Sequence, residues 1–113
     1  MSDCIFCAIA AHELPATILR EDNEVLAIRD VNPQAPTHVL IIPRKEMARL
    51  ADAGQEDQAL LGHLMLAASK VARQLGVDDA FRLVVNNGAS AGQSVFHLHL
   101  HLLAGRPFHW PPG

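Results

Sequence analysis

Residues 95–103 have the sequence Val-Phe-His-Leu-His-Leu-His-Leu-Leu, in which histidine and leucine alternate from residue 97 onward. Successive side chains of a β-strand point to opposite faces. His97, His99 and His101 would therefore lie on one face, about 6.6 Å apart, with the leucines on the other. A helix would scatter the three rings. The stretch predicts a strand with a row of imidazoles on one face and core residues on the other.

The remaining pattern predicts an α+β fold around this strand. Apolar and β-branched stretches predict further strands at residues 17–20, 25–29, 37–42 and 81–85. Apolar residues at three- and four-residue intervals predict a long amphipathic helix over residues 56–75, ended by Gly76, and residues 4–11 predict a short apolar helix. Five strands with hairpin-like links and one long helix indicate a five-stranded antiparallel sheet that the helix covers.

Length and composition limit the classes of function. Residues 1–113, half of them hydrophobic, are expected to form one domain with a substantial core. The formal net charge of −3 gives no basic footprint for nucleic acid or for an acidic membrane. The first residues lack the pattern of a secretory signal, and no stretch reaches the roughly 20 apolar residues of a membrane span. We expect a soluble cytoplasmic protein with neither kind of partner.

Three histidines on one strand face suit nucleophilic, acid–base or metal chemistry. The preceding Gly92-Gln93-Ser94 offers donors that match phosphate oxygens, which favours attack on phosphorus. For that attack the far nitrogen of His99 needs a free lone pair, so the near nitrogen must donate its proton to an acceptor. Neighbouring imidazoles could stabilise the cationic ring or transfer a proton to the leaving group. A metal site and a merely exposed row of histidines stay open as alternatives.

Cys4 and Cys7 have the spacing of half a zinc site or of a redox pair. The sequence has no second Cys-x-x-Cys, and two cysteines do not make a disulfide framework. Three interpretations stay open: small buried residues on a short helix, zinc ligands shared with a histidine such as His97, and redox chemistry.

Motifs along nearly the whole chain match one known pattern. The alternation in residues 97–103 is accompanied by matches at residues 4–7, 30–38, 61–65, 84–86 and 91–95, and by the ending His109-Trp110-Pro111-Pro112-Gly113. Together they resemble the histidine-triad (HIT) superfamily, and in particular its branch of histidine triad nucleotide-binding (Hint) proteins. The fragile-histidine-triad, galactose-1-phosphate uridylyltransferase and scavenger decapping branches lack the Trp-Pro-Pro-Gly ending.

The resemblance implies a purine nucleoside phosphoramidase, which cleaves the P–N bond of adenosine 5′-phosphoramidate and related AMP–amine conjugates to AMP and amine. His99 corresponds to the nucleophile that forms a nucleotidyl-histidine intermediate, and the main-chain carbonyl of His97 to the acceptor that orients it. His101 would contact the phosphate, with His38 as the fourth histidine of the site. Ser94 matches the position that hydrogen-bonds the leaving amine.

The resemblance also implies which residues bind the purine nucleotide. Phe6, Ile9, Leu14 and Ile28 would form the walls of the base pocket, Asp30 would bind the ribose hydroxyls, and Asn86 would lie near the sugar and phosphate. Gln93 and the Gly92 backbone would surround the phosphate. From the residues alone, the four apolar side chains could equally be core, and Asp30 and Asn86 could be turn residues.

Family members are homodimers in which the sheet continues across the two-fold axis. By this resemblance, residues 104–113 form a C-terminal tail at the dimer interface, where Trp110 would influence specificity for the amine.

The chain departs from the family at two positions. Some bacterial relatives bind zinc through the Cys-x-x-Cys pair, the first triad histidine and a further histidine where this chain has Glu46, so we expect no metal and no other cofactor. Arg29 replaces a histidine that many relatives have near the ribose. Two other classes of function remain open: a nucleotide-binding regulator with incidental hydrolysis, and a zinc-binding module. The physiological amine or acyl conjugate is not encoded in any motif.

Overall fold

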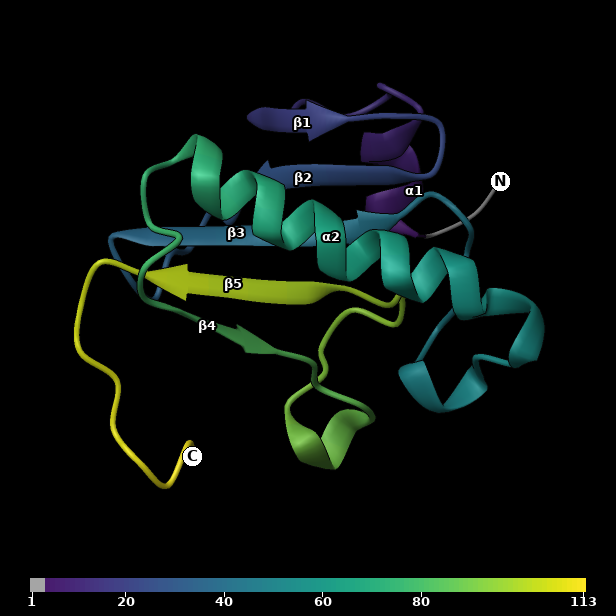
Figure 1. Cartoon of the computed structure of the whole chain (residues 1–113). Coiled ribbons are helices and arrows are strands. Elements are labelled where there is room, and N and C mark those ends of the chain that lie inside the picture. The colour runs from purple at the N-terminus through teal and green to yellow at the C-terminus, as the bar shows by residue number, and fades with distance from the viewer. Residues whose placement is uncertain (1–3) are drawn as a thin grey trace.

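A five-stranded antiparallel sheet forms the centre of the structure, a computed structural model that describes residues 4–113 (Figure 1). The strand order is β1-β2-β3-β5-β4. The strands are β1 (Ile18–Glu21), β2 (Val25–Arg29), β3 (Thr37–Pro43), β4 (Phe81–Val84) and β5 (Leu100–Ala104). The helices are α1 (Ile5–Ala10) and α2 (Gln58–Gln74), with 3-10 turns η1 (Leu50–Asp52), η2 (Gln55–Asp57) and η3 (Ala89–Ala91). The α+β architecture expected from the sequence is confirmed.

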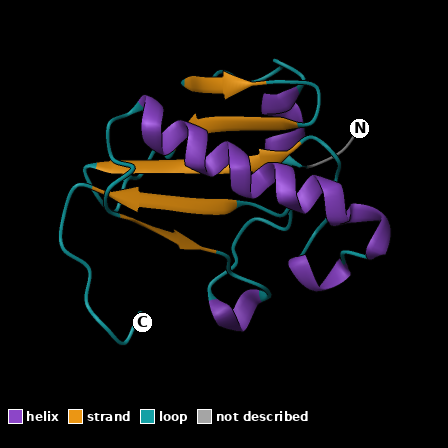
Figure 2. Ribbon diagram, in the orientation of Figure 1, coloured by secondary structure: helices purple, strands orange, loops and turns teal. Residues whose placement is uncertain are grey.

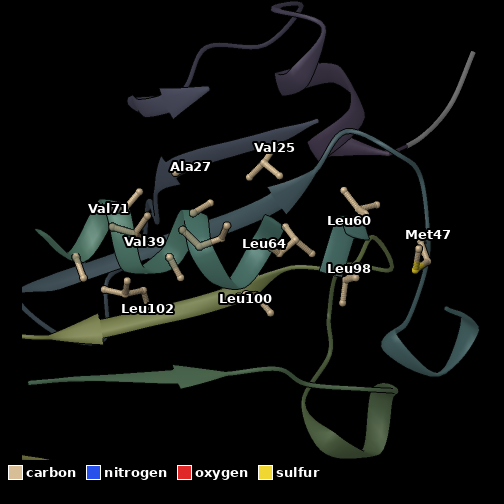
Figure 3. Packing of buried hydrophobic residues seen from close by; sticks show 14 residues of the cluster. Val25, Ala27, Val39, Met47, Leu60, Leu64, Val71, Leu98, Leu100 and Leu102 are labelled. Atoms are coloured by element: carbon tan, nitrogen blue, oxygen red, sulfur yellow. The ribbon is translucent and has the colours of Figure 1, made fainter. Parts of the chain in front are cut away.

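The long helix α2 crosses one face of the sheet, where it packs on β2, β3 and β5 (Figure 2). Its apolar stripe includes Leu64 and Val71, which are almost completely buried against Val39, Leu100 and Leu102 of the sheet (Figure 3). The helix ends as predicted, because Gly76 has a φ of 71°, a left-handed conformation that glycine adopts without strain. This face is the main core of the protein.

The short helix α1 packs on the opposite face of the sheet. Phe6 and Ile9 of α1 are buried with Ile28 of β2 and with Leu40 and Ile42 of β3. The residues between them in β2 and β3 point to α2 instead, as the pleat of a strand requires. With only six residues, α1 covers part of its face, and this is the face on which the histidine side chains lie.

The strand expected at residues 95–103 is shorter than predicted, and this is a correction. β5 begins at Leu100, so His97 and His99 precede the strand and only His101 lies within it. β3 ends at Pro43, which has no backbone N–H to donate. The N–H of Leu98 donates instead to the carbonyl of Met47, 2.6 Å away. Residues 95–99 are therefore held by individual contacts rather than by a regular strand ladder.

Candidate functional site

A cavity of about 410 Å³ lies on the α1 face of the sheet, and His99 and His101 line it. Its volume is within the range of pockets that enclose small organic ligands. Six other residues expected at a nucleotide site also line it, and they come from α1, the segment that follows it, β2 and the loop before β5: Phe6, Ile9, Leu14, Ile28, Asp30 and Ser94. The cavity thus combines apolar walls with a few polar groups.

The protonation of His99 is set by a backbone carbonyl. Nδ1 of His99 lies 2.7 Å from the carbonyl oxygen of His97. Because a carbonyl only accepts hydrogen bonds, Nδ1 must carry the proton, and Nε2 of the neutral ring keeps its lone pair. Burial lowers the pKa of His99 below its usual value. The ring is packed edge-on against Phe6, with centroids 5.0 Å apart. His99 is therefore a neutral imidazole with a free lone pair and a defined orientation.

A chain of hydrogen bonds fixes the opposite tautomer on His101. The backbone N–H of Gln34 donates to Nδ1 of His38 over 3.0 Å, so a neutral His38 carries its proton on Nε2. That nitrogen lies 2.9 Å from Nδ1 of His101, which must then accept. His101 consequently carries its own proton on Nε2 and can donate it to an anionic oxygen.

The pKa values of this chain of rings favour the neutral forms. Burial, followed by the neighbouring His99 and His38, lowers the pKa of His101 to about 4. Burial also lowers the pKa of His38, although the Asp30 carboxylate, 3.4 Å from its Nε2, acts in the opposite direction. A lone-pair donor, His99, thus lies beside a proton donor, His101, with ring centroids 4.9 Å apart.

The three imidazoles lie on the α1 face as predicted, since Phe6 contacts the rings of both His97 and His99 and the alternating leucines belong to the core on the α2 face, but His97 has different surroundings from the other two. The His97 side chain is completely buried and does not line the cavity of His99 and His101. Its Nε2 donates to the carbonyl of Pro43, 2.7 Å away, and its Nδ1 faces the thiols of Cys4 and Cys7 at 3.0 and 3.4 Å. The contact of His97 with the site is through its main-chain carbonyl.

Cys4, Cys7 and His97 form a cluster that fits a divalent metal. The three ligand atoms lie within 4.8 Å of one another. In tetrahedral zinc sites the bonds are about 2.3 Å to sulfur and about 2.0 Å to nitrogen, so small shifts would suffice to bind an ion. Burial, followed by the neighbouring Cys4 and Glu46, raises the pKa of the Cys7 thiol to about 12. The thiol is therefore protonated, and a bound cation would displace that proton.

Three of the expected residues lie in the segment between β4 and β5 and do not line the cavity. The Gln93 side chain is buried and bonds to the N–H of Gly88 and to the carbonyls of Ala48 and Val95. Asn86 lies beside Gly92, whose φ of 101° requires a left-handed backbone. Asn86, Gly92 and Gln93 are not among the residues that line the cavity. They shape the loop that presents Ser94.

Several lining residues were not singled out by the sequence. They are Ile5, Pro15, Val31, Leu40 and Val95. Leu40 had a usable signal, because it lies two residues after His38 on the same face of β3. The exposed Val31 had no signal in the sequence, since exposed apolar residues in loops are common. Arg29, noted as a departure from the family, also lines the cavity.

Comparisons with known proteins agree with the fold and the motifs. A family model described as the HIT domain matches residues 11–108. An uncharacterized HIT-like protein of Synechocystis sp. is 61% identical over 111 residues, which are 98% of this chain and 97% of that protein. A HIT family hydrolase from Legionella pneumophila Philadelphia 1 has a crystal structure that is similar with a TM-score of 0.96 at 48% identity, covering 98% of this chain and 100% of the other. The structure of a histidine triad nucleotide-binding protein from Candida albicans has a TM-score of 0.83 at 30% identity and covers 96% and 83% of the two chains.

Proposed function

The chain belongs to the HIT domain family, and on that premise we propose that it is a purine nucleoside phosphoramidase of the Hint type. It would hydrolyse the P–N bond of adenosine 5′-phosphoramidate and of AMP–amine conjugates to give AMP and amine. The similarity to a structure described as a hydrolase supports hydrolysis. The similarity to a nucleotide-binding protein supports the class of ligand.

One observation carries the proposal, namely the opposite tautomers of His99 and His101 at one cavity. Nε2 of His99 attacks the α-phosphorus, and the electron pair of the P–N bond leaves with the amine nitrogen, which takes up one proton from the solvent. The new cationic ring is stabilised by its Nδ1–H bond to the His97 carbonyl, while Nε2–H of His101 donates to a phosphate oxygen. Water then attacks phosphorus, the electron pair returns to His99, and one proton of that water is released.

The remaining residues of the cavity suit the nucleoside. Phe6, Ile9, Leu14 and Ile28 give the base an apolar slot, and Asp30 can accept hydrogen bonds from both ribose hydroxyls. Oδ1 of Asp30 also accepts from the N–H of Asn32, which fixes the carboxylate. Ser94 lies at the edge of the cavity, where its hydroxyl can bond to the leaving amine. These roles are part of the proposal.

A homodimer is also part of the proposal. β4 pairs with β5 only, among the strands that the structure describes, so one edge of the sheet has unpaired backbone groups. The tail after β5 lies beside that edge, since Arg82 of β4 donates to the carbonyl of His109. Trp110 is 82% exposed, a large apolar area for a single chain. Pairing of two β4 edges would continue the sheet and give the tail a surface to pack on.

No helix within residues 4–113 has the length and apolar character to span a membrane.

The experiment that tests the proposal compares two histidine variants with the unchanged protein. His99→Ala should reduce the release of amine from adenosine 5′-phosphoramidate at least about a thousandfold, because the nucleophile is lost. AMP binding should change little. His12→Ala removes a histidine whose side chain is 58% exposed and away from the cavity, so it should have normal turnover. Undiminished amine release by His99→Ala would overturn the assignment. If the unchanged protein binds AMP but does not cleave adenosine 5′-phosphoramidate, the result would favour a nucleotide-binding regulator.

A further inference from the structure

The turn that follows β5 lies against the loop that connects β2 and β3. This loop comprises residues 30–36, and within it the N–H of Gln34 donates to Nδ1 of His38. A Cβ placed on Gly105 would come within 2.9 Å of Cβ of Pro36, so a side chain at this position would force the loop to move. Gly105 also has a φ of 94°, which glycine adopts without strain. The beginning of the tail is thus in direct contact with the loop.

Arg106, the next residue of the tail, binds this loop at Gln34. Its Nε donates to the carbonyl of Gln34 over 3.1 Å, and a second nitrogen of the same guanidinium donates to the carbonyl of Pro107 over 3.2 Å. The guanidinium carbon lies 4.3 Å from the centre of the Phe108 ring, a favourable contact between a cation and an aromatic face. The contacts with Pro107 and Phe108 orient the planar guanidinium, so its bond to Gln34 has a fixed direction.

Gln34 is also the residue at which the hydrogen-bonded chain to His101 begins. Its carbonyl accepts from Arg106, while its N–H donates to Nδ1 of His38. The side-chain amide of Gln34 donates to the carbonyl of Asn32, a contact within the loop itself. The bond from Arg106, by contrast, connects Gln34 to the turn after β5. Arg106 therefore holds the residue that orients His38.

A shift of Gln34 would change the protonation pattern of two rings. Without the N–H of Gln34, Nδ1 of His38 loses its donor, and the proton of the neutral ring can occupy either nitrogen. Nε2 of His38 lies 2.9 Å from Nδ1 of His101, so His101 would no longer be restricted to the tautomer that donates from its own Nε2. The proton donor at the cavity thus depends on how firmly the loop is held.

We infer that Arg106 is a positioning residue, which fixes the tautomer of His101 through Gln34 and His38. Arg106 is not among the residues that line the cavity, so it acts without touching the substrate. The tail, which we propose as part of a dimer interface, thereby also serves the site of its own chain. The effect of Arg106 on turnover rests on the proposed function, whereas its effect on the tautomer does not.

The tautomers are measured by ¹⁵N NMR of the histidine-labelled full chain near neutral pH, without any substrate. In the unchanged protein His38 and His101 should both carry their proton on Nε2. Arg106→Met keeps an unbranched side chain but removes the charge and the donors, so it should give a mixture of tautomers at both rings. Arg106→Lys, which keeps a cation and a donor, should recover most of the Nε2–H form.

Arg82→Met is the matched control. Arg82 also lies over the Phe108 ring, with its guanidinium carbon 5.1 Å from the ring centre, but it donates to the carbonyl of His109 in the tail rather than to the loop. The spectra of His38 and His101 in Arg82→Met should match those of the unchanged protein.

Turnover of adenosine 5′-phosphoramidate tests the second half of the inference. In Arg106→Met kcat should fall about three- to tenfold with little change in KM, because fewer molecules have the correct proton donor while the cavity walls are intact. Arg106→Lys should recover most of this loss. Thermal melting of each variant checks that the fold is retained.

Identical His101 spectra in Arg106→Met and the unchanged protein would overturn the inference. An equal change in Arg82→Met would overturn it as well, since the effect would then belong to the tail as a whole. A changed tautomer with unchanged kcat would overturn the part that concerns the reaction. If the unchanged protein does not cleave phosphoramidates, the proposed function fails while the spectra still decide the tautomer, so the two failures are distinguishable.

Discussion

His99 and His101 are identical side chains two residues apart, yet their neighbours give them opposite tautomers. The carbonyl of His97 takes the Nδ1 proton of His99, whereas His38 donates a proton to Nδ1 of His101. His38 can do so because its own Nδ1 accepts from the N–H of Gln34. Both chains of hydrogen bonds therefore begin at a backbone group, the carbonyl of His97 or the N–H of Gln34. Neither group gains or loses a proton near neutral pH. The chemical difference between the two rings is built into the fold.

A change at His38 tests this difference. In His38→Leu, His101 no longer has a donor at Nδ1 and can hold its proton there, facing away from the phosphate. We expect kcat to fall about 10- to 100-fold with little change in KM, as for the loss of a proton donor to the reacting group. His38→Gln, whose amide can still donate to His101, should recover most of the activity. Steady-state kinetics and thermal melting of both variants check this. Equal kcat in His38→Leu and the unchanged protein would contradict the assigned chain.

The pH dependence of turnover follows from the lowered pKa values. Burial lowers the pKa of His99, and that of His101 is lowered to about 4. A lowered pKa means that the ring stays neutral to more acidic pH, so His99 keeps its lone pair below pH 6.5. We expect the acidic limb of kcat/KM to lie below pH 6.5. The measurement is the rate from pH 8 to pH 4.5, corrected for uncatalysed hydrolysis. A limb centred at or above pH 6.5 would contradict the neutral assignment.

At the scale of elements, one arginine connects the end of α1 with β1 and with the turn between β1 and β2. Arg44, just after β3, donates to the carbonyl of Ala10 at the end of α1, to the carbonyl of Asp22 in the β1–β2 turn, and to the carboxylate of Glu21. The helix α1 is short and carries Phe6, which lines the cavity. A helix of six residues is not stable by itself, so its position depends on such contacts.

Replacement of Arg44 should therefore loosen α1. In Arg44→Ala we expect the free energy of unfolding to fall by about 1–3 kcal/mol, because bonds from a charged donor are lost and the Ala10 carbonyl is left without this partner. Affinity for AMP should fall as well, since α1 forms part of the cavity wall. Urea unfolding and calorimetric titration measure the two effects. Arg73→Ala, on the exposed side of α2, should change neither. Unchanged stability and affinity in Arg44→Ala would show that α1 is held by its apolar contacts alone.

At the scale of the whole molecule, one face of the sheet carries the main hydrophobic core and the other carries the cavity. The α2 face holds most of the buried aliphatic residues and stabilises the fold. The α1 face holds the cavity of His99 and His101, and the thiol cluster is linked to it through the His97 carbonyl. The edge formed by β4 and the tail beside it is the surface on which we propose that a second copy pairs. Stability, chemistry and assembly are thus distributed over separate surfaces.

The chain contains a single tryptophan, so its fluorescence reports on the tail. Trp110 is 82% exposed in the isolated chain. In a dimer that covers the tail, its emission should move to shorter wavelength as protein concentration rises, because the indole leaves water. Sedimentation over the same concentrations should give a mass near twice 12.3 kDa. A dimer whose tryptophan still emits as an exposed indole would contradict packing of the tail at the interface, and a monomer at all concentrations would contradict the dimer.

The sequence by itself determined which face of each element is buried. The alternation in β3 and β5 and the three- and four-residue spacing in α2 are local periods, and a local period is a property of the chain before it folds. The motifs likewise predicted eight of the residues that line the cavity, among them Asp30 and His101. The sequence also indicated Gly76 as the end of the long helix.

The tertiary structure alone decided where the first histidine points and which atoms carry protons. His97 meets Cys4 across 93 positions of sequence, and His38 meets His101 across 63. β5 begins only at Leu100, because Pro43 ends β3 and the N–H of Leu98 donates to Met47 instead. Contacts over such separations depend on how strands and helices are arranged in space, which no local period encodes. Of the three imidazoles that share the α1 face, two therefore line the cavity and one, His97, faces the thiols of Cys4 and Cys7 instead.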